Sequence, residues 1–129
     1  MKFQWRFLLK VAESLVSGSP EEQQIRSAVN RAYYAALGEA REFAISKGLV
    51  MRPGGAGSHQ QIWNFLRQQA APTTHESAAW KSIGDLGLAL TADRKLADYI
   101  APAMIDLNDA RRVIVTAYQI VKKIHGLRR

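Results

Sequence analysis

Cysteine is absent from the 129 residues of the chain. Its absence excludes disulfides, thiol catalysis and thiolate metal sites. Long hydrophobic runs are missing as well, because no stretch approaches the ~20 apolar residues that cross a bilayer. The first residues are too polar, and their apolar run too short, for a signal peptide. We therefore expect a cytoplasmic protein that has no contact with a membrane.

The sequence also has little that favours β-structure. It contains no alternating run of β-branched and polar residues, and no Asn-Gly or Asp-Gly hairpin turn. Hydrophobic residues make up 47% of the chain and charged residues 22%, which is typical of a folded globular protein. A length of 129 residues fits one domain. We predict a single all-α domain over residues 1–129.

Positive charge is in excess. The net charge is +7 and the isoelectric point about 10.1. Such an excess favours polyanions, because their phosphates attract the cations and release condensed counterions on binding. Small basic domains without a specific anionic partner also exist. Charge alone therefore makes RNA or a nucleotide a candidate partner and does not decide it.

Apolar residues recur at three- and four-residue spacing in five segments, each bounded by residues that cap or break helices. The predicted helices span about 3–17, 20–47, 59–69, 74–99 and 102–125. Short links between them predict an antiparallel four- to five-helix bundle with up-and-down order. In the fourth segment, Gly84 and Gly87 leave room for another helix to approach closely.

Two capping motifs set the predicted helix starts. Ser19 is expected to cap the second helix, with Pro20 at its first position and Glu22 completing a capping box. Thr73 and Glu76 form the same kind of motif before the fourth helix.

The apolar stripe of the predicted helix 74–99 changes near its end. Leu90 closes three apolar turns, and Arg94 follows on the same face. A charge on a core-facing stripe costs several kcal/mol unless it is paired. Asp98, four residues further on, is the natural partner, and Tyr99 ends the helix.

Two compatible interpretations of Arg94 follow. The first is a local salt bridge with Asp98 that fixes the last turn. The second is a small polar site in which Arg94 binds a phosphate, since its planar fork suits bidentate contacts, and Asp98 or Tyr99 helps to position it.

The second helix contributes further candidates. Tyr33 lies near the apolar stripe and is expected in the core, whereas Asn30 and Tyr34 share a flanking face. A buried asparagine needs hydrogen-bond partners, so Asn30 is either an internal strut or a site residue. We include Asn30 and its neighbour Arg31 among the candidate binding residues.

Histidines are few, and none has the spacing of metal ligands. No metal or other cofactor is therefore expected. His59 lies in the first turn of the predicted third helix, where the helix N-terminus disfavours its protonated form. It is the best catalytic candidate of the three histidines.

The segments 7–15 and 25–43 resemble the first two helices of HEPN domains, which carry an R-A-Y-Y-A motif like that at residues 31–35. The segment 93–99 is similar to the family's R-x-x-A-D-Y motif before the last long helix. The resemblance covers about residues 5–124. It implies an antiparallel bundle, often a homodimer, that belongs to toxin–antitoxin or other prokaryotic defence systems and is frequently encoded beside a minimal nucleotidyltransferase.

Ribonuclease members of this family cut RNA without metal, using an arginine separated by four to six residues from a histidine. Arg94 matches the arginine, but Tyr99, Ile100 and Ala101 stand where the histidine is expected. The general acid–base group is therefore missing, and tyrosine titrates too high to replace it at neutral pH.

Three functions remain open. The first is a HEPN-like module that binds RNA or a nucleotide, or a partner protein, without catalysis. The second is a metal-independent ribonuclease toxin that uses Arg94 with Tyr99 or with His59. The third is a protein-interaction bundle that pairs with a nucleotidyltransferase. For the third, tryptophans 5, 63 and 80 are candidate anchors, although we expect at least two of them in the core.

Overall fold

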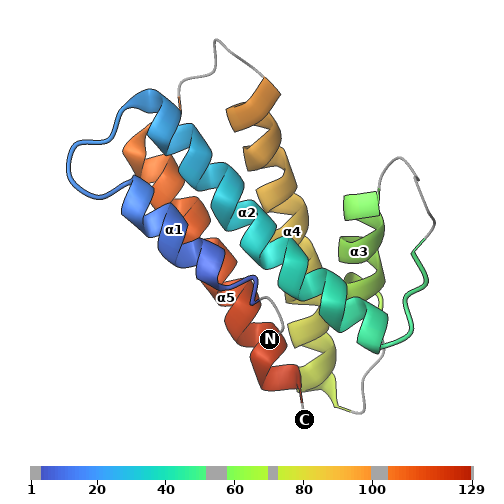
Figure 1. Cartoon of the computed structure of the whole chain (residues 1–129). Coiled ribbons are helices and arrows are strands. Elements are labelled where there is room, and N and C mark those ends of the chain that lie inside the picture. The colour runs from blue at the N-terminus through green and yellow to red at the C-terminus, as the bar shows by residue number, and fades with distance from the viewer. Residues whose placement is uncertain (1–3, 52–57, 70–72, 100–104, 129) are drawn as a thin grey trace.

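The computed structural model describes residues 4–51, 58–69, 73–99 and 105–128, with residues 98 and 99 described by their backbone only. In these ranges the regular structure is helical and no strand is present. The helices are α1 (Phe7–Leu15), α2 (Glu22–Ser46), α3 (Ser58–Arg67), α4 (Thr74–Tyr99) and α5 (Leu107–Leu127) (Figure 1). The predicted all-α bundle is confirmed. Within the described ranges no helix has the length and hydropathy needed to cross a bilayer.

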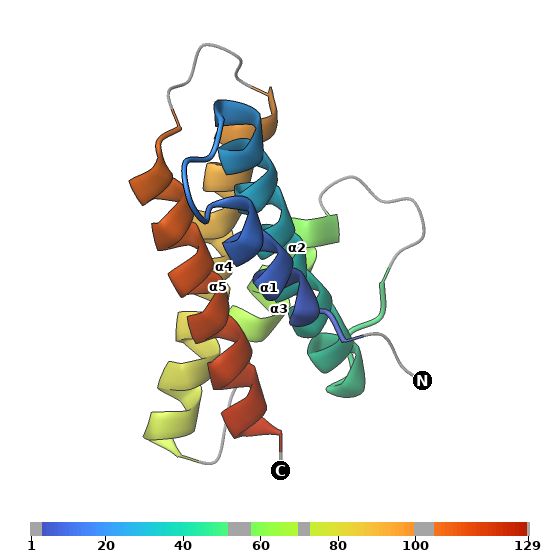
Figure 2. The ribbon, with the colours of Figure 1, turned by 60° about the vertical axis from the view of Figure 1, so that its left-hand side comes forward.

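Helix α2 is the centre of the bundle, because it packs against each of the other four helices. The helices α1, α2, α4 and α5 alternate in direction along the chain, as the up-and-down order predicts (Figure 1). Helix α3 lies outside this group of four and packs mainly on α4 (Figure 2). The first turn of α3 thereby faces the middle of α4, where the candidate site lies.

Helix α2 starts later than predicted, so the expected capping box is wrong. Its N-cap is Glu21, and the Gln24 side chain accepts a hydrogen bond from the Glu21 backbone N–H at 2.7 Å. Ser19 therefore lies outside the helix. The C-terminus behaves as expected: Gly48 has a φ of 109°, and the N–H of Leu49 donates to the carbonyl of Ala44. This is the Schellman arrangement that glycine favours.

The ends of α1, α3 and α5 differ from the prediction by a few residues, whereas α4 spans the predicted 74–99. Helix α1 is shorter than the predicted 3–17, and helix α5 begins at residue 107 instead of 102. Residues 102–104 lie outside the described ranges, but Asp106 has an extended backbone and caps α5 by accepting from the N–H of Asp109 at 2.8 Å. The predicted cap of α4 is confirmed, since Thr73 Oγ1 accepts from the N–H of Glu76 at 3.1 Å.

Two glycines bring α3 against α4, as the sequence predicts. A β-carbon at Gly84 would lie 2.6 Å from the carbonyl oxygen of Trp63, and one at Gly87 would overlap the Trp63 ring. Trp63 is fully buried and Trp80 is buried in a stack on Phe43, whose ring centroid is 4.9 Å away. The expectation that at least two tryptophans belong to the core is confirmed.

Candidate functional site

Arg94 occupies the buried face of α4, as its place on the apolar stripe predicts. Its exposed fraction is 7%, and it is the one buried charged residue among those whose burial the structure describes. Its guanidinium carbon lies 5.2 Å from the ring centroid of Tyr33 and 5.8 Å from that of Tyr34. Both distances are within the range of cation–π attraction, which offsets part of the desolvation of the cation.

Tyr33 and Tyr34 are neighbours on α2, and the sequence places their side chains on different faces. In the structure Tyr33 is fully buried and Tyr34 is half-buried. Their rings meet edge to face with centroids 5.4 Å apart, so both reach Arg94 at the seam between α2 and α4. The expectation that Tyr33 belongs to the core is confirmed. Tyr34 provides a second aromatic ring within cation–π distance of Arg94.

His59 joins this cluster from α3. Its Nδ1 lies 3.0 Å from the hydroxyl oxygen of Tyr33, and its ring lies edge-on to Tyr34 at 6.0 Å. The close packing of α3 on α4 makes this contact possible, because His59 precedes Trp63 by one turn on α3. The structure therefore brings together two of the sequence-predicted site residues, His59 and Arg94.

Thr91 is a site residue that the sequence analysis missed. Its Oγ1 donates a hydrogen bond to the carbonyl of Gly87 at 2.9 Å and lies 3.3 Å from the hydroxyl oxygen of Tyr33. Thr91 precedes Arg94 by three residues on the same helix. This spacing could have identified Thr91 from the sequence, because residues three apart on a helix share a face.

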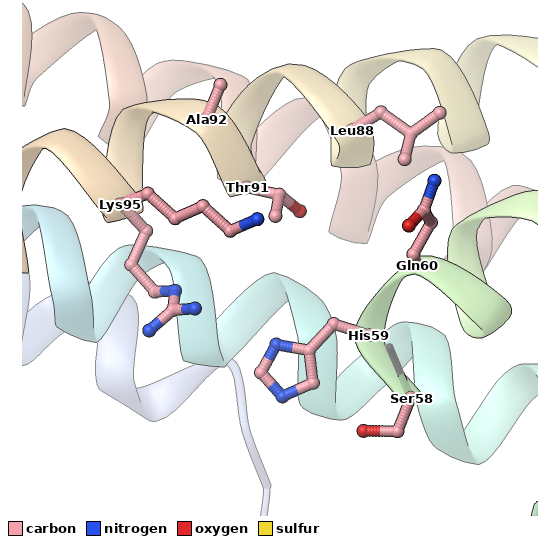
Figure 3. A pocket seen from close by; sticks show the side chains of 8 residues that line it. Ser58, His59, Gln60, Leu88, Thr91, Ala92 and Lys95 are labelled. Carbon is pink, nitrogen blue, oxygen red and sulfur yellow. The ribbon is translucent and has the colours of Figure 1, made fainter. Parts of the chain in front are cut away.

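An open pocket of about 470 Å³ lies in front of this cluster. Figure 3 shows His59 of α3 opposite Thr91 and Lys95 of α4. The pocket is lined by Ser58, His59, Gln60, Leu88, Thr91, Ala92, Arg94 and Lys95. Two adjacent cations and one imidazole thus border a volume that can hold a phosphate with part of a nucleotide.

The electrostatics of the pocket keep His59 neutral. Burial lowers its pKa below the usual 6.5, and the charges of Arg94 and Lys95 lower it further. The direction agrees with the sequence prediction, which rested on the helix N-terminus. Burial raises the pKa of Tyr33, although the charge of Arg94 opposes that shift. The Tyr33 hydroxyl therefore keeps its proton at neutral pH.

Two further predicted site residues, Asn30 and Arg31, do not line this pocket. Asn30 is half-buried and Arg31 is exposed on α2. The side chains of Asp98 and Tyr99 lie outside the described residues, so their roles beside Arg94 stay predictions. Arg26 of α2 also contacts the last turn of α4, where it donates to the carbonyl of Ala97 at 2.7 Å.

A metal centre has no support in the described part of the chain. No three side chains of histidine, aspartate or glutamate come together there in a way that could hold an ion.

Comparisons with models of protein families, with curated proteins and with solved structures find no match to this chain. The resemblance to HEPN domains stays a prediction from sequence motifs. The function has to be inferred from the pocket and its charges.

Proposed function

We propose that the pocket between α3 and α4 binds a phosphate group of RNA or of a nucleotide, as part of a HEPN-like module. The observation that carries the proposal is the position of Arg94. It is a buried cation, it lies within cation–π distance of two tyrosine rings, and it lines an open pocket beside a second cation, Lys95.

A phosphate suits this arrangement of two cations at an open pocket. Cation–π contacts with Tyr33 and Tyr34 help to orient the guanidinium of Arg94. Arginine binds phosphate through two parallel hydrogen bonds, and a guanidinium already fixed by packing loses little side-chain entropy when it does so. Lys95 adds a mobile point charge at the pocket rim. The overall charge of +7 attracts anions from a distance.

The test compares two lysines of the same helix. Lys95 borders the pocket, whereas Lys81 is also exposed on α4 but lies away from it. Binding of a fluorescent RNA oligonucleotide is measured by anisotropy over a series of salt concentrations. We expect Lys95→Ala to weaken binding about fivefold and to reduce the logarithmic salt slope by about one, because one phosphate contact is lost.

The Lys81→Ala variant removes the same charge and serves as the matched control. It should leave the salt slope close to that of the wild type. Equal effects of the two substitutions would mean that the chain attracts RNA through its net charge only. Arg94→Lys, which keeps the charge but loses the planar fork, is expected to weaken binding further.

A specific observation favours a second candidate function, a metal-independent ribonuclease. His59 stands beside Arg94 in the pocket, and its lowered pKa keeps it neutral and able to accept a proton. In such a reaction the imidazole removes the proton of a ribose 2′-hydroxyl. The 2′-oxygen then attacks the adjacent phosphorus to form a 2′,3′-cyclic phosphate, the bond from phosphorus to the 5′-oxygen breaks, and the 5′-oxygen takes a proton from water. Arg94 would neutralise the charge on the phosphorus oxygens.

Cleavage of several RNAs in the presence of EDTA tests this candidate. Loss of cleavage in both His59→Gln and Arg94→Lys would support it, and so would growth arrest on expression that Arg94→Lys relieves. If wild-type protein that binds RNA leaves every substrate intact, the chain is a binding module.

The resemblance to HEPN domains adds three further proposals. They are independent of the pocket. They are a toxin–antitoxin or defence setting, a homodimer, and a nucleotidyltransferase-type partner protein. Light scattering of the purified chain tests the homodimer, with a mass near twice 14.4 kDa as the expected result. Co-purification with a nucleotidyltransferase encoded beside it tests the partner.

A further inference from the structure

Three hydrogen-bonding groups form a chain that ends at His59. Thr91 Oγ1 is 2.9 Å from the carbonyl oxygen of Gly87, the Tyr33 hydroxyl is 3.3 Å from Thr91, and His59 Nδ1 is 3.0 Å from Tyr33. The first contact has a fixed direction, since a carbonyl oxygen only accepts. The direction of the other two contacts follows from it.

The number of hydrogens on each group determines which group donates in each contact. Each hydroxyl has one hydrogen to donate, and Thr91 gives its hydrogen to Gly87. The contact between Thr91 and Tyr33 is then a hydrogen bond only if Tyr33 donates. Tyr33 has no second hydrogen, so the contact with His59 is a hydrogen bond only if Nδ1–H of the imidazole donates. If the proton of His59 were on Nε2 instead, one of the three hydrogen bonds would be lost.

The other ring nitrogen, Nε2, is consequently the unprotonated one. It has no hydrogen-bond partner among the described residues, and it is not buried. His59 also lines the pocket, beside Arg94 and Lys95. The site therefore combines two cations, which attract phosphate oxygens, with an imidazole whose Nε2 carries a lone pair.

We infer that Tyr33 and Thr91 hold His59 in its Nδ1–H tautomer, so that Nε2 accepts a hydrogen bond from the 2′-hydroxyl of a ribonucleotide whose phosphate lies on Arg94 and Lys95. The inference rests on the proposed function. It makes the pocket selective for RNA over DNA, because the ribose hydroxyl is the donor that DNA lacks. Tyr33 and Thr91 are positioning residues, which act through the imidazole.

The tautomer is measured first, without any ligand. Two-bond proton–nitrogen correlation spectra distinguish the protonated from the bare nitrogen of a neutral imidazole, and the His59→Gln variant assigns the signals. We expect the proton on Nδ1 in the wild type. In Thr91→Val the Tyr33 hydroxyl loses its acceptor and turns to Nδ1, so the proton is expected on Nε2. Thr91→Ser keeps the hydroxyl and should restore the wild-type pattern.

These spectra have two outcomes that overturn the inference. One is a wild-type imidazole with its proton on Nε2. The other is a folded Thr91→Val variant with an unchanged tautomer, because position 91 would then have no influence on His59. Circular dichroism confirms the fold of each variant, and Tyr33→Phe provides a second way to break the chain.

Binding is measured next with one oligonucleotide sequence made as RNA, as 2′-O-methyl RNA and as DNA. The methylated form keeps the RNA-like shape and lacks the donor. We expect wild type and Thr91→Ser to bind RNA about fivefold more tightly than either analogue, which is the value of one hydrogen bond. In Thr91→Val this preference should vanish. If RNA is cut during the measurement, the cleavage rate replaces affinity and the same ranking of variants is expected.

The two proposals fail in different ways. Equal binding of RNA and its 2′-O-methyl analogue by the wild type overturns the inference and leaves the phosphate site standing. Absence of binding to all three oligonucleotides overturns the proposed function and this inference with it.

Discussion

The indole ring of Trp63 on α3 lies against the backbone of Gly87 on α4, in the space that a β-carbon at position 87 would fill. The carbonyl of the same glycine accepts the hydroxyl of Thr91. One residue without a side chain therefore fixes the approach of α3 and the start of the hydrogen-bond chain to His59. The packing of the core and the geometry of the site are linked at this point.

Replacement of Gly87 by alanine is expected to destabilise the protein. The added β-carbon would overlap the ring of Trp63, which is fully buried. Overpacking of this kind costs about 2 kcal/mol, which exceeds the gain in helix propensity of about 1 kcal/mol. Urea denaturation measures the free energy of unfolding, and the His59 imidazole signals report whether α3 has moved.

Gly126→Ala is the matched control. Gly126 also lies in a helix, and a β-carbon there meets nothing within 4 Å. The control should therefore stabilise α5 by up to about 1 kcal/mol. A Gly87→Ala variant as stable as this control would contradict the tight contact with Trp63.

The sequence predicted the part of the site that local spacing encodes. Arg94 stands on the apolar stripe of α4, and Gly84 and Gly87 stand where a small residue admits another helix, so these features follow from helical periodicity. The contacts of Tyr33 with His59 and with Thr91 join residues 26 and 58 positions apart. No periodic pattern reports such pairs, because they depend on how the helices pack.

The errors at helix ends have a local cause. Ser19, Pro20 and Glu22 match a capping motif, but Glu21 and Gln24 form a capping box of their own and start α2 two residues later than predicted. Two overlapping motifs compete here, and spacing alone does not rank them. The same holds for α5, where Asp106 and Asp109 form a capping box that the prediction of a start near residue 102 overlooked.

Stability should fall on acidification because of His59. Its pKa in the folded protein is lowered by burial and by the charges of Arg94 and Lys95, so the unfolded chain binds the proton more readily. The stability contributed by the neutral imidazole is complete above the unfolded pKa of about 6.5 and is lost as the pH falls through that value towards the folded pKa. The slope for one proton is at most about 1.4 kcal/mol per pH unit.

The measurement compares the free energy of unfolding of wild type and His59→Gln between pH 4.5 and 8. The carboxylates are common to both proteins, so the difference curve isolates His59. We expect the free energy of unfolding of the wild type, relative to that of His59→Gln, to rise with pH. The exposed His125→Gln variant controls for the loss of an imidazole in general. A flat difference curve for His59 would contradict the lowered pKa.

Arg26 is expected to hold the end of α4 in place. It donates to the carbonyl oxygens of Ala97 and Leu96, which lie in the last turns of α4. Arg26→Ala should destabilise the fold by about 1 kcal/mol and speed amide hydrogen exchange at the end of α4. Glu22→Gln removes only the exposed ion pair with Arg26 and should cost less than about 0.5 kcal/mol. Similar exchange rates in the two variants would show that the contact between α2 and α4 contributes little.

A last prediction concerns the contact between α1 and α5. The Tyr118 hydroxyl donates to the carboxylate of Glu13, and this hydrogen bond, with burial and the negative charge, raises the pKa of Tyr118 to about 12. Absorbance of tyrosinate, compared between wild type and Tyr118→Phe, measures this titration. In Glu13→Gln the pKa should fall towards the ordinary value of 10, since the charge and the charged acceptor are both lost. Glu76→Gln, which removes a carboxylate from the start of α4, should leave the titration unchanged.

The folded state holds the proton of the Tyr118 hydroxyl more tightly than the unfolded chain does, so the stability from the contact is present below pH 10 and is lost between pH 10 and about 12. A titration of Tyr118 near pH 10 in the wild type would mean that α1 and α5 are not joined by this hydrogen bond in solution.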